Sequence, residues 1–188
     1  MNAPSLRSVL RHPAVRVVLV LGVVLLVVAL FVFEPWKLFL DRTVDEAAPA
    51  AAGPAATAPA GTAPVGTGPA APVVLARGEL ISHEHASSGS VVVLGLADGS
   101  RVLRLEDLRT SDGPLLKVWL TDAPVIAGRD GWHVFDDGRY VDLGELKGNL
   151  GSSNYPVPPG VDLASLPSLS IWCDRFNVSF AAAALMPA

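Results

Sequence analysis

The longest apolar run in the chain lies near its N-terminus. Residues 17–33 read VVLVLGVVLLVVALFVF and contain no charged or polar side chain. Residues 14–16 extend this run to about 20 residues, because the stem of Arg16 can snorkel along apolar surroundings. About 20 apolar residues in a helix cross the hydrocarbon core of a bilayer. The pattern therefore predicts a single transmembrane helix over residues 14–36.

The charges on either side of this run predict its orientation. Three arginines precede it, whereas the segment after it mixes acidic and basic residues: Glu34, Lys37, Asp41, Arg42, Asp45 and Glu46. By the positive-inside rule, residues 1–13 stay in the cytoplasm and the rest of the chain is exported. A cleaved signal peptide is the competing interpretation. Its apolar core is usually about 7 to 15 residues and ends at a small-x-small site, whereas EPWKLFLD follows here. We therefore expect an uncleaved, single-pass plasma-membrane anchor.

A compositionally biased segment follows the anchor. Residues 47–72 consist of Ala, Pro, Gly, Thr and one Val, and a proline recurs at every fifth position from 49 to 69. Regular prolines remove amide donors and prevent a continuous helix. We therefore assign residues 37–72 to a juxtamembrane segment and a disordered, partly polyproline linker. Such a linker reaches about 80 Å at roughly 3.1 Å per residue.

From Val73 onward, short runs rich in Val, Leu and Ile alternate with turn signals about every ten residues. SVVVLGL and RVLRLEDL flank Asp98-Gly99, which is typical of a β-hairpin. No window in this region keeps the apolar period of a helix. Residues 73–188 are therefore expected to form an all-β extracytoplasmic domain, an antiparallel β-sandwich or flattened barrel of roughly seven to nine strands.

Charge and motif content narrow the functions of this domain. Residues 73–188 carry nine Lys and Arg against fourteen Asp and Glu, so their acidity points away from nucleic acid as a partner. The sequence contains no G-x-S-x-G, H-E-x-x-H, Walker or dinucleotide-binding motif. A classical enzyme is therefore not the favoured interpretation.

The single cysteine of the chain, Cys173, lies in the segment SIWCDRF. Leu169, Ile171 and Cys173 share one face of a strand pattern, but the apolar positions after Asp174 have the opposite parity. A change of parity requires a bulge, a bend or a strand that changes sheet. Cys173 is thus expected beside an irregularity. It is either a small buried hydrophobe, a redox thiol, a soft ligand to haem or copper, or half of an intermolecular disulfide.

Histidines are the other candidate ligands. His83 and His85 are two positions apart, so on a strand they would project to the same face. Two histidines can begin a metal site but do not define one, and solvated polar residues near a turn are the simpler interpretation. We therefore assign no metal site.

Three segments together resemble a known family. RVLRLEDLRTSDGPLLKVWLTD, LGELKGNLGSSNYPVPPGVDL and SLSIWCDRFNVSFAAAAL are similar in order and spacing to the DM-thirteen domain, also called the electron-transfer DM domain. The resemblance covers about residues 76–186. It implies a β-rich extracellular module in which Cys173 occupies the place of the family's suspected redox cysteine. His85, before SSG, corresponds to a position where the family often has histidine.

The resemblance leads to two functional hypotheses. The first is a membrane-anchored redox or electron-transfer module centred on Cys173, with His85 as a further candidate ligand and haem as a candidate cofactor. Trp119 and Trp172 would then line a haem slot or fill the core, and the electron partner would be another protein in the cell envelope. The alternative is a non-catalytic binding or adhesion module, which requires a fully buried, unreactive thiol.

Overall fold

The computed structural model describes residues 12–49 and 71–188. Most of the linker expected over residues 47–72 thus lies outside the described residues. By its internal contacts the chain divides into two units, one ending at Trp36 and one spanning Lys37–Ala188. Each unit is described by itself.

The N-terminal unit contains one helix, α2 (Pro13–Phe33). Pro13 occupies the first turn, where its missing amide hydrogen costs nothing. The helix ends at Glu34, which adopts a left-handed conformation (φ 43°) and donates its backbone N–H to Leu30 O. The most apolar part of α2 has a mean hydropathy of 3.1, and none of it is buried. At about 1.5 Å per residue its length suits a bilayer crossing, which fits either a membrane anchor or a signal sequence. A short 3₁₀ helix, η1 (Pro35–Phe39), follows it.

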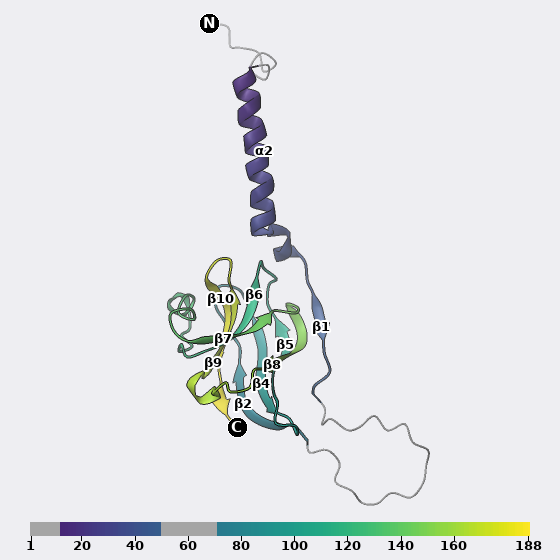
Figure 1. Cartoon of the computed structure of the whole chain (residues 1–188), viewed down its shortest axis with the longest axis vertical. Coiled ribbons are helices and arrows are strands. Elements are labelled where there is room, and N and C mark those ends of the chain that lie inside the picture. Colours follow the sequence, from purple (N-terminus) through teal and green to yellow (C-terminus); the bar gives the residue numbers. More distant parts are fainter. Residues whose placement is uncertain (1–11, 50–70) are drawn as a thin grey trace, which may run out of the picture. The chain divides into compact units, whose positions relative to one another are not determined.

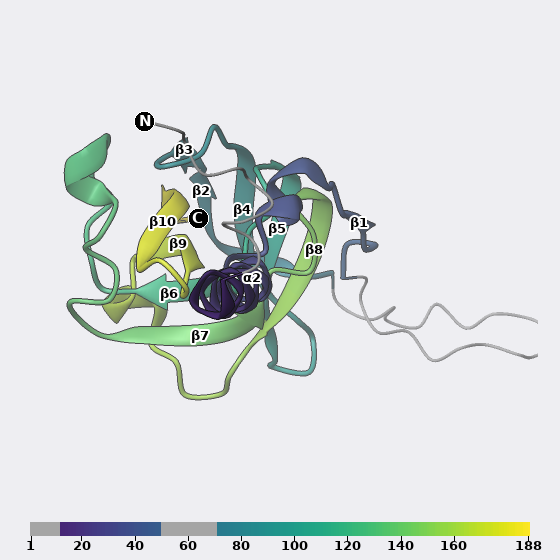
Figure 2. The same ribbon diagram turned by 90° about the horizontal axis from the view of Figure 1, so that it is seen from above.

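The larger unit is a sandwich of two sheets (Figures 1 and 2). One sheet has the strand order β1-β8-β5-β4-β2-β11 and the other β3-β10-β9-β6-β7. The all-β sandwich predicted from the sequence is confirmed. The eleven strands among the described residues are β1 (Thr43–Asp45), β2 (Val73–Glu79), β3 (Ile81–Ser82), β4 (Ser88–Gly95), β5 (Arg101–Arg109), β6 (Leu116–Thr121), β7 (Tyr140–Glu145), β8 (Leu150–Val157), β9 (Ser168–Cys173), β10 (Val178–Ala184) and β11 (Met186–Pro187).

The predicted hairpin at Asp98-Gly99 joins β4 to β5, which pair antiparallel. Asp98 accepts hydrogen bonds from the backbone N–H and the hydroxyl of Ser100. Gly99 adopts a φ of 82°, a conformation that glycine reaches without steric cost. The turn residues thus fix the register of β4 and β5.

Two apolar clusters hold the sandwich together. The central core lies between the sheets and includes Leu103, Leu105, Ile171, Cys173 and Phe180. A second group, here called the outer cluster, consists of Trp119, Ala123, Phe135, Trp172 and Ala182. Because Trp172 and Cys173 are consecutive on β9, their side chains point to opposite faces of the sheet. The outer cluster is therefore the packing layer on the far side of that sheet, covered by residues from the β6–β7 connection.

The change of parity after Cys173 has a simple structural cause. Cys173 is the last residue of β9, and the chain turns through residues 174–177 into β10, where Val178 pairs with Cys173. Asn177 has a φ of 50° in this turn. A register shift between Ser179 and Ala181 then places a bulge in β10. The expected irregularity is a hairpin turn followed by a bulge, so the segment forms two strands.

Part of the juxtamembrane segment belongs to the sandwich. Thr43–Asp45 forms β1, which runs parallel to β8 with Val44 opposite Gly151. The sequence analysis assigned residues 37–72 to a juxtamembrane segment and a linker and identified no strand there. Three strand residues carry too little alternation to be recognised, and their partner lies more than 100 residues away in sequence.

Candidate functional site

Cys173 is the last residue of β9, the middle strand of its sheet. On β9 it is paired with Leu116 of β6 on one side and with Val178 of β10 on the other. Its side chain is 0% exposed, and its S–H donates to the carbonyl of Pro114 at an Sγ–O distance of 3.2 Å. Burial raises the pKa of the Cys173 thiol, and hydrogen bonding to the backbone of Phe176 and Arg175 offsets this only in part.

These properties limit the chemistry open to the thiol. The thiolate is the nucleophilic form of cysteine, and a raised pKa keeps Cys173 protonated near neutral pH. A fully buried sulfur also has no surface on which a second chain could form a disulfide with it. Cys173 can therefore take part in chemistry that needs no direct contact with a partner, but not in thiol exchange at the surface of this fold.

His85 lies in the turn after β3, where its ring packs on Phe180 with ring centroids 3.9 Å apart. Its side chain is 24% exposed and its Nε2 lies 3.8 Å from the Glu84 carboxylate. Burial lowers the pKa of His85, and the Glu84 charge acts in the opposite direction. Within residues 12–49 and 71–188, no hydrogen bond or ion pair joins His85 to Cys173.

His83 has a different environment from His85. It is buried, its ring stacks near Phe135, its Nε2 lies 3.1 Å from the carbonyl of Ile126 and its Nδ1 lies 2.9 Å from the hydroxyl of Ser179. The carbonyl can only accept, so Nε2 carries the hydrogen and neutral His83 presents Nδ1 as an acceptor. Burial lowers the pKa of His83. The sequence suggested that both histidines share a face, whereas His83 contacts the outer cluster and His85 contacts the central core.

A hydrogen-bond network continues from His83 into β9 and β10. Ser170 donates to the hydroxyl of Ser179 at 3.0 Å, beside the His83 ring. A serine next to a histidine resembles a nucleophile and its base, but Ser170 and Ser179 are completely buried. The network therefore satisfies buried polar groups and offers no surface to a substrate.

A stack of aromatic rings crosses three neighbouring strands on the outer face of this sheet. Tyr140 of β7 stacks on Trp119 of β6 with ring centroids 4.0 Å apart and an interplanar angle of 10°. Trp119 in turn stacks on Trp172 of β9 at 5.1 Å and 22°. The exposed fraction falls from 46% for Tyr140 to 4% for Trp119 and 0% for Trp172. This set of three rings, the aromatic ladder, runs from the protein surface to the residue beside Cys173.

The indole N–H groups of the ladder make no hydrogen bonds. Among the described residues, the N–H groups of Trp119, Trp132 and Trp172 are buried without a hydrogen-bond partner. A buried, unpaired donor costs about 1–3 kcal/mol. The ladder is therefore held by packing and ring stacking alone. Its spatial order follows from the pairing register of β7, β6 and β9, a signal that sequence periodicity does not carry.

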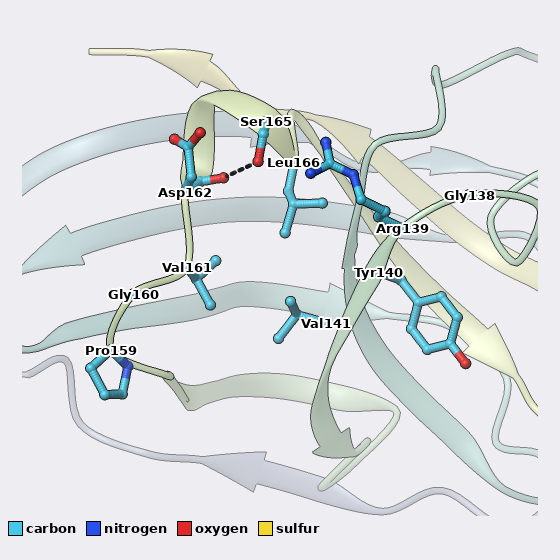
Figure 3. Close-up of a pocket in the computed structure, with 10 residues that line it drawn as sticks. All are labelled: Gly138, Arg139, Tyr140, Val141, Pro159, Gly160, Val161, Asp162, Ser165 and Leu166. Carbon is cyan, nitrogen blue, oxygen red and sulfur yellow. Dashed lines mark hydrogen bonds between the residues drawn. The ribbon is translucent and has the colours of Figure 1, made fainter.

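The geometry does not fit a haem group at Cys173. An axial thiolate needs an open slot beside the sulfur. Cys173 is instead enclosed by the central core, and its S–H is hydrogen-bonded to the carbonyl of Pro114. A pocket of about 710 Å³ lies elsewhere, between the start of β7 and residues 159–166. In Figure 3 Val141 and Val161 face each other across it, while the ring of Tyr140 points away. Trp119 and Trp172 fill the outer cluster.

No group of three or more His, Cys, Asp and Glu side chains in the described part of the chain is arranged to hold a metal ion.

Comparison with known proteins gives one match. Residues 79–185, more than half of the chain, match the family described as Electron transfer DM13. No curated protein and no solved structure matches the chain. The matched region contains Cys173, His85 and all three rings of the aromatic ladder, and it begins after β1. The chain therefore belongs to the DM13 electron-transfer family.

Proposed function

We propose that this protein is a membrane-anchored, extracytoplasmic electron-transfer module in which Cys173 is the redox group. In this proposal α2 is an uncleaved single-pass anchor with a cytoplasmic N-terminus, supported by the arginines before it and by its length and hydropathy. The family description supports electron transfer as the activity. The electron partner is another redox protein of the cell envelope, and nucleic acid plays no part.

The observation that carries the proposal is the aromatic ladder. A buried thiol is out of reach of a docked partner, but electrons can move between groups that are not in contact when easily oxidised rings lie between them. Tyr140, Trp119 and Trp172 supply such rings, stacked at 4.0 and 5.1 Å from the surface inward. Trp172 is bonded through the backbone to Cys173.

The reaction is a one-electron oxidation of the thiol. One electron leaves the Cys173 sulfur through the ladder to a one-electron acceptor on the partner protein, and the thiol proton leaves to solvent through the exposed turn of residues 174–177 beside it, which leaves a thiyl radical. Return of one electron and one proton restores the thiol. Because burial raises the pKa of Cys173, the resting sulfur holds its proton, so its oxidation to the neutral thiyl radical releases both an electron and a proton.

Flash photolysis of the purified full chain in detergent tests this proposal, with photogenerated tris(bipyridine)ruthenium(III) as the one-electron oxidant. In the unmodified protein we expect a tryptophan radical that decays as a sulfur-centred radical forms. In Cys173→Ser, whose hydroxyl can still donate to Pro114, the tryptophan radical should live at least several-fold longer. Trp119→Phe keeps a stacked ring that is much harder to oxidise, and it should slow the formation of the sulfur radical. An unchanged tryptophan lifetime in Cys173→Ser would overturn the proposal.

A second function is favoured by the burial of Cys173 itself. A completely buried thiol with a raised pKa is what a binding or adhesion module requires, and the pocket between β7 and residues 159–166 is lined partly by Val141, Val161 and Leu166. The same photolysis experiment separates the two functions, because a binding module has no electron path that depends on Cys173.

A further inference from the structure

We propose that residues 41–47, here called the strap, act as a non-covalent clasp that fastens the DM13 domain to its own anchor independently of the Ala/Pro-rich linker. The inference rests on the anchor of the proposed function and does not depend on electron transfer. The strap precedes the linker in sequence, and the family match begins only at residue 79. The contacts described below therefore join a segment outside the matched region to the matched domain.

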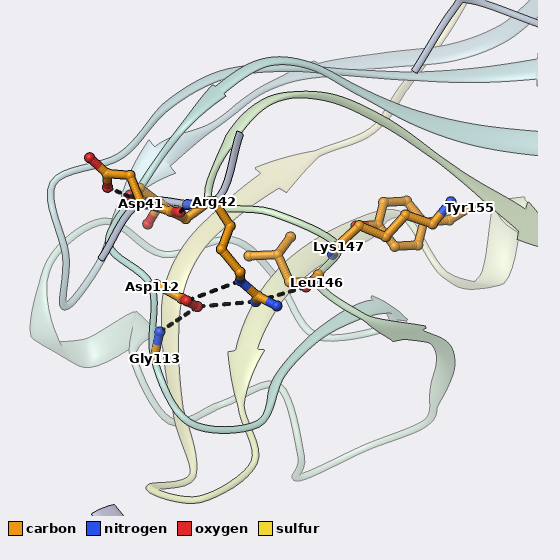
Figure 4. Close-up of polar contacts among 9 residues, drawn as sticks. Asp41, Arg42, Asp112, Gly113, Leu146, Lys147 and Tyr155 are labelled. Atoms are coloured by element: carbon orange, nitrogen blue, oxygen red, sulfur yellow. Dashed lines mark hydrogen bonds and ion pairs between the residues drawn. The ribbon is translucent and has the colours of Figure 1, made fainter. Parts of the chain in front are cut away.

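The first half of the strap is held by a buried carboxylate. Arg42 Nε and Nη2 donate to the two oxygens of Asp112 at 3.1 and 3.2 Å, and Nη2 also donates to Leu146 O at 3.3 Å (Figure 4). Asp112 is 2% exposed. Asn149 accepts from the backbone N–H of Arg42 at 2.7 Å and donates to the carboxylate of Asp41 at 2.9 Å. Removal of the strap would thus break the ion pair with Arg42 and leave Asp112 the hydrogen bond from the backbone N–H of Gly113, and breaking a buried ion pair is costly.

The second half of the strap is held by charge and backbone contacts. The Glu46 carboxylate accepts from Lys147 Nζ and from the backbone N–H of Asn154, both at 2.7 Å. Arg104 donates to Glu46 O at 2.9 Å, and Asn154 Nδ2 donates to Ala47 O at 2.9 Å. Between the two halves, β1 pairs with β8 along its whole length. The strap is therefore bound at both ends and along its backbone.

Two glycines of the domain make room for the strap. A Cβ at Gly148 would lie 2.5 Å from Arg42 O and 2.8 Å from a methyl group of Val44, and a Cβ at Gly151 would meet Val44 O. The backbone of the strap thus approaches the domain as closely as glycine allows. Gly148, unlike Gly151, has an ordinary backbone conformation. The strap is therefore the main obstacle to a side chain at position 148.

The clasp changes the role of the Ala/Pro-rich segment. With the strap bound, residues 34–40 alone connect α2 to the domain, a chain of at most about 25 Å, and the length of residues 48–72 has no effect on this reach. With the strap released, residues 34–72 make up the connection, about 120 Å if extended at roughly 3.1 Å per residue. The 80 Å spacer expected from the sequence then operates only in the released state.

Linker cleavage in the full chain tests the clasp. A protease site replaces residues 55–60, an affinity tag is placed at the N-terminus, and the protein is cut in detergent or liposomes and washed on an affinity resin. We expect the cut domain, residues 61–188, to stay with the tagged fragment. Gly148→Ala should release most of it, whereas Gly95→Ala, on β4 with a new Cβ in ordinary contact with the Leu75 side chain at 3.4 Å, should retain it.

The outcomes separate the clasp from the anchor. Release of the cut domain from the unmodified chain would overturn the clasp, and so would equal retention by Gly148→Ala. If circular dichroism shows that Gly148→Ala does not fold, the double variant Arg42→Ala/Glu46→Ala takes its place with the same expected release. Loss of residues 1–33 before cleavage, seen by intact mass, would overturn the anchor. Native mass spectrometry with the tag moved ahead of Lys37 would then still show whether the cut pieces remain together.

Discussion

Replacement of Trp172 by phenylalanine offers the sharpest test of the ladder, because it removes the oxidisable indole while we expect the fold to survive. Trp172 is fully buried, stacks on Trp119, and has an unpaired indole N–H. Truncation of a buried tryptophan to alanine usually lowers the free energy of unfolding by about 3–5 kcal/mol. Phenylalanine keeps a ring in the stack and removes the unpaired donor.

The expected change in the free energy of unfolding follows from two opposed effects. A cavity of about 40 Å³ at about 24 cal/mol per Å³, together with lost apolar contacts, costs about 2 kcal/mol. Relief of the unpaired N–H returns about 1–3 kcal/mol. We therefore expect Trp172→Phe to lie within about 1.5 kcal/mol of the unmodified protein. Leu169→Ala, on the same strand and fully buried without a polar atom, should cost about 2–5 kcal/mol.

Urea unfolding of residues 37–188, followed by circular dichroism, measures both variants under the same conditions. A loss of more than about 3 kcal/mol in Trp172→Phe would refute the reasoning, because it would mean that the indole N–H is paired in solution. If the variant is as stable as expected, its slower sulfur oxidation in the photolysis experiment can be assigned to the missing indole and not to a damaged fold.

Three further predictions concern titratable groups. Because burial raises the pKa of Cys173, iodoacetamide at pH 8 should label it only after unfolding in urea; rapid labelling of the folded protein would contradict the burial. The pKa of His83 is lowered in the fold, so the unfolded chain binds the extra proton and stability should fall as the pH drops below about 6.5. His83→Gln should reduce the pH dependence of the free energy of unfolding in urea titrations at pH 5 to 7, and the contribution of His85 will remain. An unchanged pH dependence in this variant would contradict the lowered pKa of His83. The hydrogen bond from Lys147 lowers the pKa of Glu46. The stabilisation of the strap by the Glu46 carboxylate should therefore be lost as the pH falls from about 4.5 through that lowered pKa. Linker-cut protein should then release its domain at low pH, and Glu46→Gln should release it with less dependence on pH.

The amino-acid sequence predicted those features that depend on local patterns. Alternation and Asp98-Gly99 identified the hairpin and the sandwich, and the change of parity after Cys173 predicted the irregularity beside it. Features that depend on pairing across the sheet escaped prediction. Tyr140, Trp119 and Trp172 form a ladder only because β7, β6 and β9 are neighbours in a particular register.

The strap and the environment of His83 escaped prediction for a related reason. The strap has three strand residues, and its polar partners lie between 58 and 108 positions away in sequence. The buried ring of His83 is hydrogen-bonded to a carbonyl from the β6–β7 connection and to a hydroxyl from β10. Neither partner leaves a trace in the residues around His83. Long-range contacts of this kind become visible only once the strands are placed in space.

The short outer strands of the sandwich have a consequence for self-association. Three of its four sheet edges end in strands of two or three residues, β1, β11 and β3, and β11 carries Pro187, which has no amide hydrogen to donate. Such edges are poor templates for another chain. The fourth edge, β7, is six residues long and exposes the carboxylates of Asp142 and Glu145. If copies of this domain aggregate edge to edge, β7 is the strand on which they meet, and neutralising its two carboxylates is the change that would favour it.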